Sequence, residues 1–168
     1  EVMRRGLLYA KMFGLPVIAH CEDQDLRGEG VMNYGRTSLR LGLAGIPEVA
    51  EDIMVARDIH LAGITQGMLH LGHMSTLDAV AQLRDAKAKG IHVTGEVTPP
   101  HFALTESAIE NYDPNFKIIP PLRTQEDVDA LVQGIADSTV DVIASGHAPH
   151  PPEAKEVEFV YAPPGVVG

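Results

Sequence analysis

The feature that most constrains the fold is a regular alternation of short apolar runs with segments of helical periodicity. Apolar runs cover residues 15–19, 68–73, 91–97 and 140–144, and helix-like segments cover residues 2–13, 47–66, 75–89 and 126–136. Single helices between successive strands are typical of a parallel sheet, because parallel strands need a crossover connection that returns over the sheet. The sequence therefore predicts an α/β fold of about four parallel strands with helices on the outer side.

Turn and cap residues set the expected limits of these elements. Gly14 and Gly90 each follow a helical segment, where glycine is favoured, and Pro47 stands where proline suits the start of a helix. Ser75 is expected to cap the third helix. Residues 21–45 are polar and rich in glycine, and we interpret them as a loop.

Composition limits the classes of partner. The chain has 168 residues, of which 45% are apolar, with a formal net charge of −10 and a mean hydropathy of +0.01. Nucleic acids and anionic membrane surfaces would repel this charge. No apolar run approaches the length of a membrane span or a signal sequence, and the single cysteine, Cys21, has no partner for an internal disulfide. We therefore expect a cytoplasmic protein that binds small molecules or other proteins, with no nucleic acid and no membrane as partner.

Three histidines stand at or just beyond the carboxyl ends of predicted strands. His20, His73 and His147 each follow a different apolar run, and His101 follows the remaining one. In parallel α/β folds the working groups lie at the carboxyl ends of the strands, where neutral imidazoles from several strands can converge on a metal ion. These histidines form the candidate site.

The other histidines and the cysteine are given structural roles. His60 lies within a helical segment and His92 near the start of a strand, far from the expected active face. His70 is out of phase with the strand end and is interpreted as a packing or solvent-facing residue. Cys21 follows His20 directly and is interpreted as a buried thiol.

Several short segments carry a family resemblance. In chain order they read LPVIAHCED with GVMN downstream, then LGHMST, GEVTPPH, NFKIIPPLR and ASGHAPH. Each is weak alone, but together, in this order and at this spacing, they resemble the second half of a dihydroorotase of the amidohydrolase superfamily. The resemblance covers essentially the whole chain.

The resemblance implies a fold, a reaction and a metal. The family fold is a (β/α)₈ TIM barrel, so residues 1–168 would be a fragment of a single barrel domain that supplies strands five to eight. The family interconverts N-carbamoyl-aspartate and dihydroorotate in pyrimidine biosynthesis and depends on zinc. By this resemblance His20 and His73 match metal-binding histidines, while the family's remaining ligands precede the first residue of this chain.

The sequence departs from the family at three site positions. The family usually reads TPHH, NPPLR and TDHAPH, where this chain has Pro100, Ile119 and Gly146. The family aspartate at the third position moves a proton between the metal-bound hydroxide and the amide nitrogen, and glycine has no titratable group. The resemblance also places Ile119, His147 and His150 near the substrate, with Ile119 removing a polar contact to it.

Two interpretations of different classes follow. One is a zinc-dependent cyclic amidohydrolase acting on dihydroorotate, with doubtful activity because of Gly146. The other is an inactive dihydroorotase-like scaffold that partners aspartate transcarbamoylase. A hydantoinase-like amidohydrolase is a third alternative, which the HCED and HAPH motifs fit less well. Because half a barrel leaves open edges, a homo-oligomer is also expected.

Two further expectations can be compared with the structure. His20 and His73 should face the same end of the sheet and hold zinc weakly, because two imidazoles are too few for a closed zinc site. A Gly146→Asp substitution should place a carboxylate at the strand end without other changes and detectably raise hydrolysis of dihydroorotate. Combining it with Ile119→Asn should raise hydrolysis further, because one change supplies chemistry and the other binding.

Overall fold

The computed structural model describes all 168 residues and contains two parallel sheets of different size. The larger sheet has the strand order β1-β4-β5-β6, and the smaller one pairs β2 with β3. The strands are β1 (Pro16–His20), β2 (Met32–Asn33), β3 (Gly45–Ile46), β4 (Met68–Gly72), β5 (Val93–Val97) and β6 (Val142–Ile143). The prediction of an α/β fold with a four-stranded parallel sheet is confirmed.

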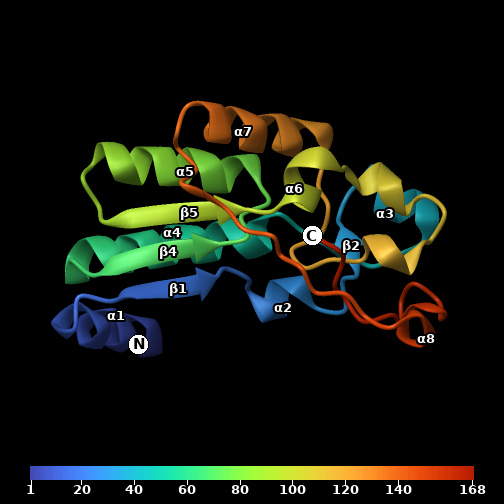
Figure 1. Cartoon of the computed structure of the whole chain (residues 1–168), viewed down its shortest axis with the longest axis horizontal. Coiled ribbons are helices and arrows are strands. Elements are labelled where there is room, and N and C mark those ends of the chain that lie inside the picture. The colour runs from blue at the N-terminus through green and yellow to red at the C-terminus, as the bar shows by residue number, and fades with distance from the viewer.

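Helices alternate with the strands along the chain (Figure 1). They are α1 (Val2–Met12), α2 (Gln24–Arg27), α3 (Arg36–Leu41), α4 (Val49–Thr65), α5 (Leu77–Ala88), α6 (Pro99–Ala103), α7 (Gln125–Ala136) and α8 (Pro152–Lys155), with 3₁₀ turns η1 (Glu106–Ile109) and η2 (Pro114–Phe116). None of the helices combines the length and the apolar character needed to span a membrane.

The register brings the carboxyl ends of the large sheet to one edge. His20 pairs with Gly72, Leu71 with Gly95, and Val97 with Ile143 at the far side. In Figure 1 the arrows of β1, β4 and β5 point toward a second lobe, which contains β2, α3 and α8, and β6 runs parallel to β5. Side chains at the strand ends therefore face the space between the sheet and this lobe.

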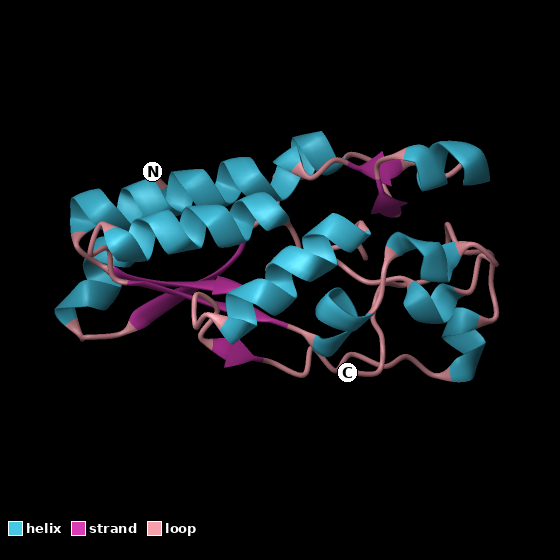
Figure 2. Ribbon diagram, turned by 90° about the horizontal axis from the view of Figure 1, so that it is seen from above, coloured by secondary structure: helices cyan, strands magenta, loops and turns pink.

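One face of the large sheet packs against helices and the other is open. Ala19, Leu69 and Leu71 belong to a buried cluster of 17 residues that also includes side chains of α4, α5 and α7. Ile18 lies on the opposite face and is 71% exposed. Figure 2 shows the long helices gathered on one side of the strands. The alternation of side chains along each strand explains this division.

This arrangement is a partial barrel. A closed (β/α)₈ barrel needs eight strands, and the large sheet has four. β1 and β6 each have a partner on one side only, so the sheet ends in two open edges. The open face and the open edges lie where the remaining strands of a closed barrel would pack.

Three local predictions need correction. Residues 21–45, interpreted as a loop, contain α2, β2, α3 and β3, because Met32 and its neighbours have a small buried core of their own. The cap of α5 is Thr76, whose hydroxyl oxygen accepts the N–H of Ala79 at 3.1 Å, while the hydroxyl of Ser75 binds Glu51. The fourth strand, predicted over residues 140–144, comprises only Val142–Ile143. Both of its side chains lie exposed at the edge of the sheet, where no further strand supports a longer pairing.

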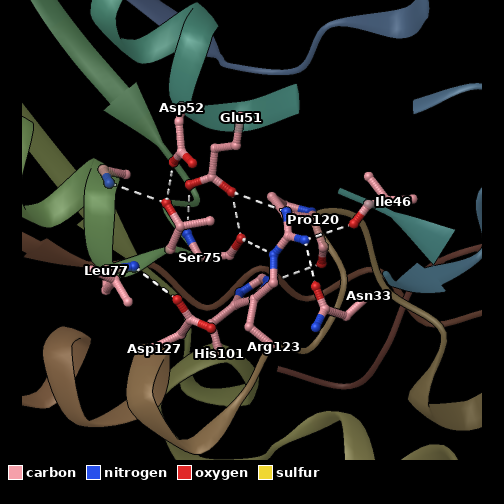
Figure 3. Close-up of polar contacts among 12 residues, drawn as sticks. Asn33, Ile46, Glu51, Asp52, Ser75, Leu77, His101, Pro120, Arg123 and Asp127 are labelled. Atoms are coloured by element: carbon pink, nitrogen blue, oxygen red, sulfur yellow. Dashed lines mark hydrogen bonds and ion pairs between the residues drawn. The ribbon is translucent and has the colours of Figure 1, made fainter. Parts of the chain in front are cut away.

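A buried polar network ties the second lobe to the sheet (Figure 3). Glu51 of α4 and Arg123 are only 3% and 2% exposed. The Glu51 carboxylate accepts the backbone N–H of Ser75 at 2.8 Å and the Ser75 hydroxyl, and it lies 3.7 Å from Arg123 Nη2. Arg123 also donates to Ser75 Oγ at 3.1 Å, to Asn33 Oδ1 at 2.7 Å and to the Ile46 carbonyl at 2.9 Å.

Burial and hydrogen bonding have opposite effects on the charge of the Glu51 carboxyl. Burial raises the pKa of the Glu51 carboxyl, whereas Arg123 and the two bonds from Ser75 favour its charged form. Removing Arg123 would leave the buried Asn33 Oδ1 without a donor and the buried Glu51 carboxylate without its cationic partner, while Ser75 still donates to Glu51 and the Tyr34 N–H to the Ile46 carbonyl. Such groups are costly to leave unpaired.

We predict that Arg123→Met lowers the free energy of unfolding by about 3–5 kcal/mol, the usual cost of breaking one side of a buried ion pair. Urea unfolding followed by circular dichroism measures the change. Arg40→Met is the matched control, because Arg40 pairs with Glu110 at the surface with its side chain 57% exposed, and exposed pairs contribute about 0–1 kcal/mol. Equal losses in the two variants would contradict the central role of Arg123.

Candidate functional site

The structure brings His20 and His73 together at the carboxyl edge of the sheet. His20 is the last residue of β1, and His73 directly follows β4, the neighbouring strand. Their rings meet edge to face with centroids 5.9 Å apart. The two imidazoles therefore face one region, as expected from their positions in the sequence.

His73 is held in an unusual backbone conformation. Its φ of +53° lies in the left-handed region, which non-glycine residues rarely adopt. Its Nε2 lies 3.2 Å from Glu96 Oε1. Burial lowers the pKa of His73, and the negative charge of Glu96 opposes this effect. Such strained positions gather at functional sites, where surrounding contacts maintain them.

Glu96 and His70 are site residues that the sequence analysis missed. Glu96 lies in β5, and its second carboxylate oxygen is 3.1 Å from His70 Nε2. His70 Nδ1 lies 2.7 Å from the hydroxyl of Thr94. The pairing of β4 with β5 shows why these residues meet. His70 lies opposite Thr94 in the register, and both side chains are on the open face of the sheet.

The donor set fits part of a zinc site. Imidazole nitrogens are ordinary zinc ligands, and a protein zinc site usually has three or four protein ligands. This chain brings two histidines into one region, but no group of three or more His, Cys, Asp or Glu side chains is arranged to hold a metal ion. His20 and His73 are thus suited to supply two ligands of a larger set.

A small cavity next to His73 contains two of the positions at which the sequence departs from the family pattern. Its volume is about 160 Å³, and it is lined by His73, Thr98, Ile118, Ile119, Gly146, Ala148, Pro164 and Gly165. The walls are mainly apolar or backbone. No carboxylate lines this cavity.

His147 and His150 follow β6 and are held by the end of the chain. His147 forms a parallel bridge with Val166, and its Nδ1 accepts the N–H of Gly168 at 3.3 Å. His150 Nε2 donates to the Pro164 carbonyl at 3.0 Å. His150 also lines a neighbouring cavity of about 290 Å³. Neither histidine lines the cavity next to His73.

The backbone at Gly146 does not accept a side chain without adjustment. Its φ is +61°, and a Cβ built there would lie 2.9 Å from Thr98 Cγ2 and 3.2 Å from Thr98 Cβ. The expectation that Gly146→Asp could place a carboxylate without other changes is therefore wrong. The physical reason is steric, because Thr98 already fills the adjacent space.

His101, the fourth strand-end histidine, has a structural position. It is buried, with Nδ1 2.6 Å from the Thr98 hydroxyl and Nε2 2.8 Å from the Pro120 carbonyl. Burial lowers its pKa to about 4. His101 thus links the end of β5 to the segment that carries Ile119, and it does not join the pair of metal-suited imidazoles.

The remaining predicted residues behave as expected. Cys21 is buried, with its Sγ 3.8 Å from Asp58 Oδ2, and burial raises the pKa of its thiol, so it is not a reactive nucleophile. His60 lies on α4 and His92 just before β5, both exposed and away from the strand-end edge.

Comparison with curated proteins shows consistent similarity to one enzyme. The chain is 52% identical over 168 residues to a protein of Endomicrobium trichonymphae named dihydroorotase, covering 100% of this chain and 40% of the relative. It is 53% identical over 167 residues to the dihydroorotase of Pelotomaculum thermopropionicum, covering 99% of this chain and 39% of the relative. The chain thus spans about 40% of the length of these relatives. No protein-family model matches the chain.

Solved structures with the same fold belong to related hydrolases. A dihydropyrimidinase from Brevibacillus agri superposes with a TM-score of 0.82 at 26% identity, covering 98% of this chain and 38% of that chain. An L-hydantoinase from Arthrobacter aurescens gives a TM-score of 0.85 at 22% identity, covering 99% and 38%. The predicted partial barrel is confirmed by these matches, each of which covers a minor part of a longer chain.

We predict that His101 makes stability depend on pH. Its folded-state pKa of about 4 lies below the ordinary value of 6.5, so the unfolded state binds more protons between these values. This contribution to stability is complete above pH 6.5 and falls by up to roughly 3 kcal/mol as pH drops toward 4. Urea unfolding at several pH values measures the loss, and His101→Gln should show a smaller loss. An identical pH dependence in both proteins would contradict the role of His101.

We predict that Gly146→Asp alone lowers the free energy of unfolding by about 1–3 kcal/mol, the usual cost of overpacking. Adding Thr98→Ser should recover part of this loss, because it removes the Cγ2 contact while keeping the hydroxyl that binds His101. Thr98→Ser alone is the control for the lost methyl group. If Gly146→Asp is as stable as the wild type, the Thr98 contact does not limit position 146.

Proposed function

Because this chain is a homologue of the dihydroorotases, in the amidohydrolase superfamily, we propose that the whole protein is a zinc-dependent cyclic amidohydrolase that binds dihydroorotate and N-carbamoyl-aspartate. We also propose that catalysis by this protein is impaired, because position 146 has no side chain that could act as an acid or base. The observation that carries both parts of the proposal is that His20 and His73 converge beside a cavity that Gly146 lines without a carboxylate.

The metal proposal rests on the two strand-end imidazoles. His20 and His73 would supply two nitrogen ligands, and the remaining ligands would come from outside these 168 residues. When bound, zinc polarises a carbonyl and lowers the pKa of a coordinated water. Burial lowers the pKa of His73 and so favours its neutral form, which is the form that binds a metal ion.

The cavity residues then determine how substrate is bound. The substrate is small and anionic, and the walls at Ile118 and Ile119 offer it only apolar contact. His150 lines the neighbouring cavity, and His147 directly follows Gly146 in the chain, so these are the groups we propose to bind its charged end. Gly146 offers no group that could hold or move a proton between water and the amide nitrogen. A positioned acid or base typically contributes a factor of about 10² to 10⁴.

An inactive scaffold is the second candidate, and the environment of Gly146 favours it. Thr98 occupies the space next to this residue, so the local structure is built around glycine. In that case the protein would serve assembly, with aspartate transcarbamoylase as the partner and self-association as a further mode.

A hydantoinase-like activity is less favoured. The matched hydantoinase and dihydropyrimidinase structures share 22% to 26% identity with the chain, whereas the dihydroorotases share 52% to 53%. The similarity to the hydantoinase and dihydropyrimidinase structures supports the fold, whereas the similarity to the dihydroorotases supports the substrate.

The proposed function includes a role in pyrimidine biosynthesis in the cytoplasm.

We predict that the purified full-length protein retains zinc, and that His20→Ala or His73→Ala reduces the zinc content measured by atomic absorption. Turnover of dihydroorotate by the wild-type protein should lie below the usual enzyme range of about 1 to 10³ per second, by a factor of about 10² to 10⁴, because position 146 lacks an acid or base. Hydantoin is the control substrate. An ordinary rate would contradict the impaired site, and absence of both zinc and turnover would support the scaffold instead.

A further inference from the structure

Lys155 of α8 is a buried cation that forms no ion pair with a carboxylate. It is 8% exposed, and its Nζ donates to the carbonyls of Pro114 at 2.9 Å and Pro163 at 2.8 Å. Burial lowers the pKa of this ammonium group, and the charge of Asp113 opposes the effect. A buried ammonium group is costly unless it is hydrogen-bonded. The two carbonyls are therefore the partners that allow Lys155 to be buried.

The segment Ala162–Gly165 cannot pair its backbone as a strand does. Pro163 and Pro164 have no N–H, so neither can donate to a neighbouring strand. Their carbonyls accept from side chains instead. Lys155 donates to Pro163, and His150 Nε2 donates to Pro164 at 3.0 Å. A lysine and a histidine thus hold a segment that a strand ladder cannot hold.

This segment forms a wall of the cavity next to His73. Pro164 and Gly165 line that cavity, as does Gly146. Gly165 also lines the neighbouring cavity of about 290 Å³, together with Lys155. Because a second cavity lies beside the wall, packing alone does not fix its position, and the hydrogen bonds must do so.

The contacts of Gly165 leave little room for displacement. Its N–H donates to the Lys117 carbonyl at 2.8 Å, and a Cβ built on it would lie 2.3 Å from the Ala148 carbonyl oxygen. Ala148 lines the same cavity and donates its own N–H to the Val166 carbonyl at 2.9 Å. A shift at Pro163, two residues before Gly165, would therefore disturb a second lining residue as well.

We propose that Lys155 is a positioning residue that holds Pro163–Gly165 as a wall of the cavity beside Gly146, in the shape that binds substrate. This inference deepens the proposed function and rests on it, since it takes this cavity as the site for dihydroorotate. Without the ammonium group the Pro163 carbonyl loses its donor, whereas the Pro114 carbonyl keeps the N–H of Lys117. The loss is thus directed at the wall. A wall that is only part of the time in place weakens the apparent affinity for substrate.

The test uses Lys155→Met in the full-length protein with zinc added, because methionine keeps the apolar stem without the donor. Hydrogen exchange followed by mass spectrometry should be faster by about 5- to 100-fold at the Ala148 and Gly165 amides, as expected for one buried hydrogen bond left unmade. The Leu69 amide, which donates to the His92 carbonyl, should keep its rate. Isothermal titration calorimetry should show dihydroorotate bound more weakly by a similar factor.

Lys89→Met is the matched control, because it removes the same charge from an exposed lysine that pairs with Asp85. It should change neither readout. Equal acceleration at Leu69 in Lys155→Met would show a general loss of stability and overturn the proposal. Unchanged exchange at Gly165 would also overturn it, as would unchanged affinity in a protein that binds dihydroorotate.

Two further outcomes are decided by the same measurements. If Lys155→Met does not fold, Lys155→Gln takes its place, since its amide still donates but ends one bond short of Nζ; it should show the same local change in smaller degree, and no change would overturn the proposal. If the wild type binds no dihydroorotate, the proposed function fails, while the exchange rates still decide the role of Lys155.

Discussion

The buried contact of Glu51 with Arg123 and Ser75 joins parts of the chain that the strand ladders leave separate. The ladders connect the four strands of the large sheet, whereas this network connects α4, the turn after β4 and the small sheet. Ser75 lies two residues after His73, and Arg123 lies four residues after Ile119. One set of buried hydrogen bonds therefore supports two segments that line the cavity, at His73 and at Ile119.

The parts of the site that could be predicted follow from local patterns. An apolar run followed by histidine is visible in the sequence, and parallel strands put such residues at one edge, so the sequence alone predicts that His20 and His73 meet. Glu96 could not be found in this way. A carboxylate within a strand is typical of a solvent-facing position, and only the pairing of β4 with β5 shows that it meets His70 and His73.

The second lobe was the least predictable part of the fold. Its elements are very short, and they are stabilised by partners far away in the sequence rather than by their own periodicity. Asn33, for example, donates to Glu106 at 2.6 Å across 73 residues, and Met32 packs with Ile109 and Phe159. Residues 21–45 therefore have the composition of a loop, although tertiary contacts give them regular structure.

The structure also separates the groups that hold the fold from those that would perform chemistry. Arg123 and His101 bond to buried acceptors behind the cavity, whereas Ile119 and Gly146 line it. A substitution in the lining can thus alter the chemistry without breaking the network. Thr98 connects the two sets, because its hydroxyl binds His101 while its methyl group fills the space beside Gly146. A carboxylate at position 146 is consequently a question of packing as well as of chemistry, since any side chain there must move a residue that the buried network holds.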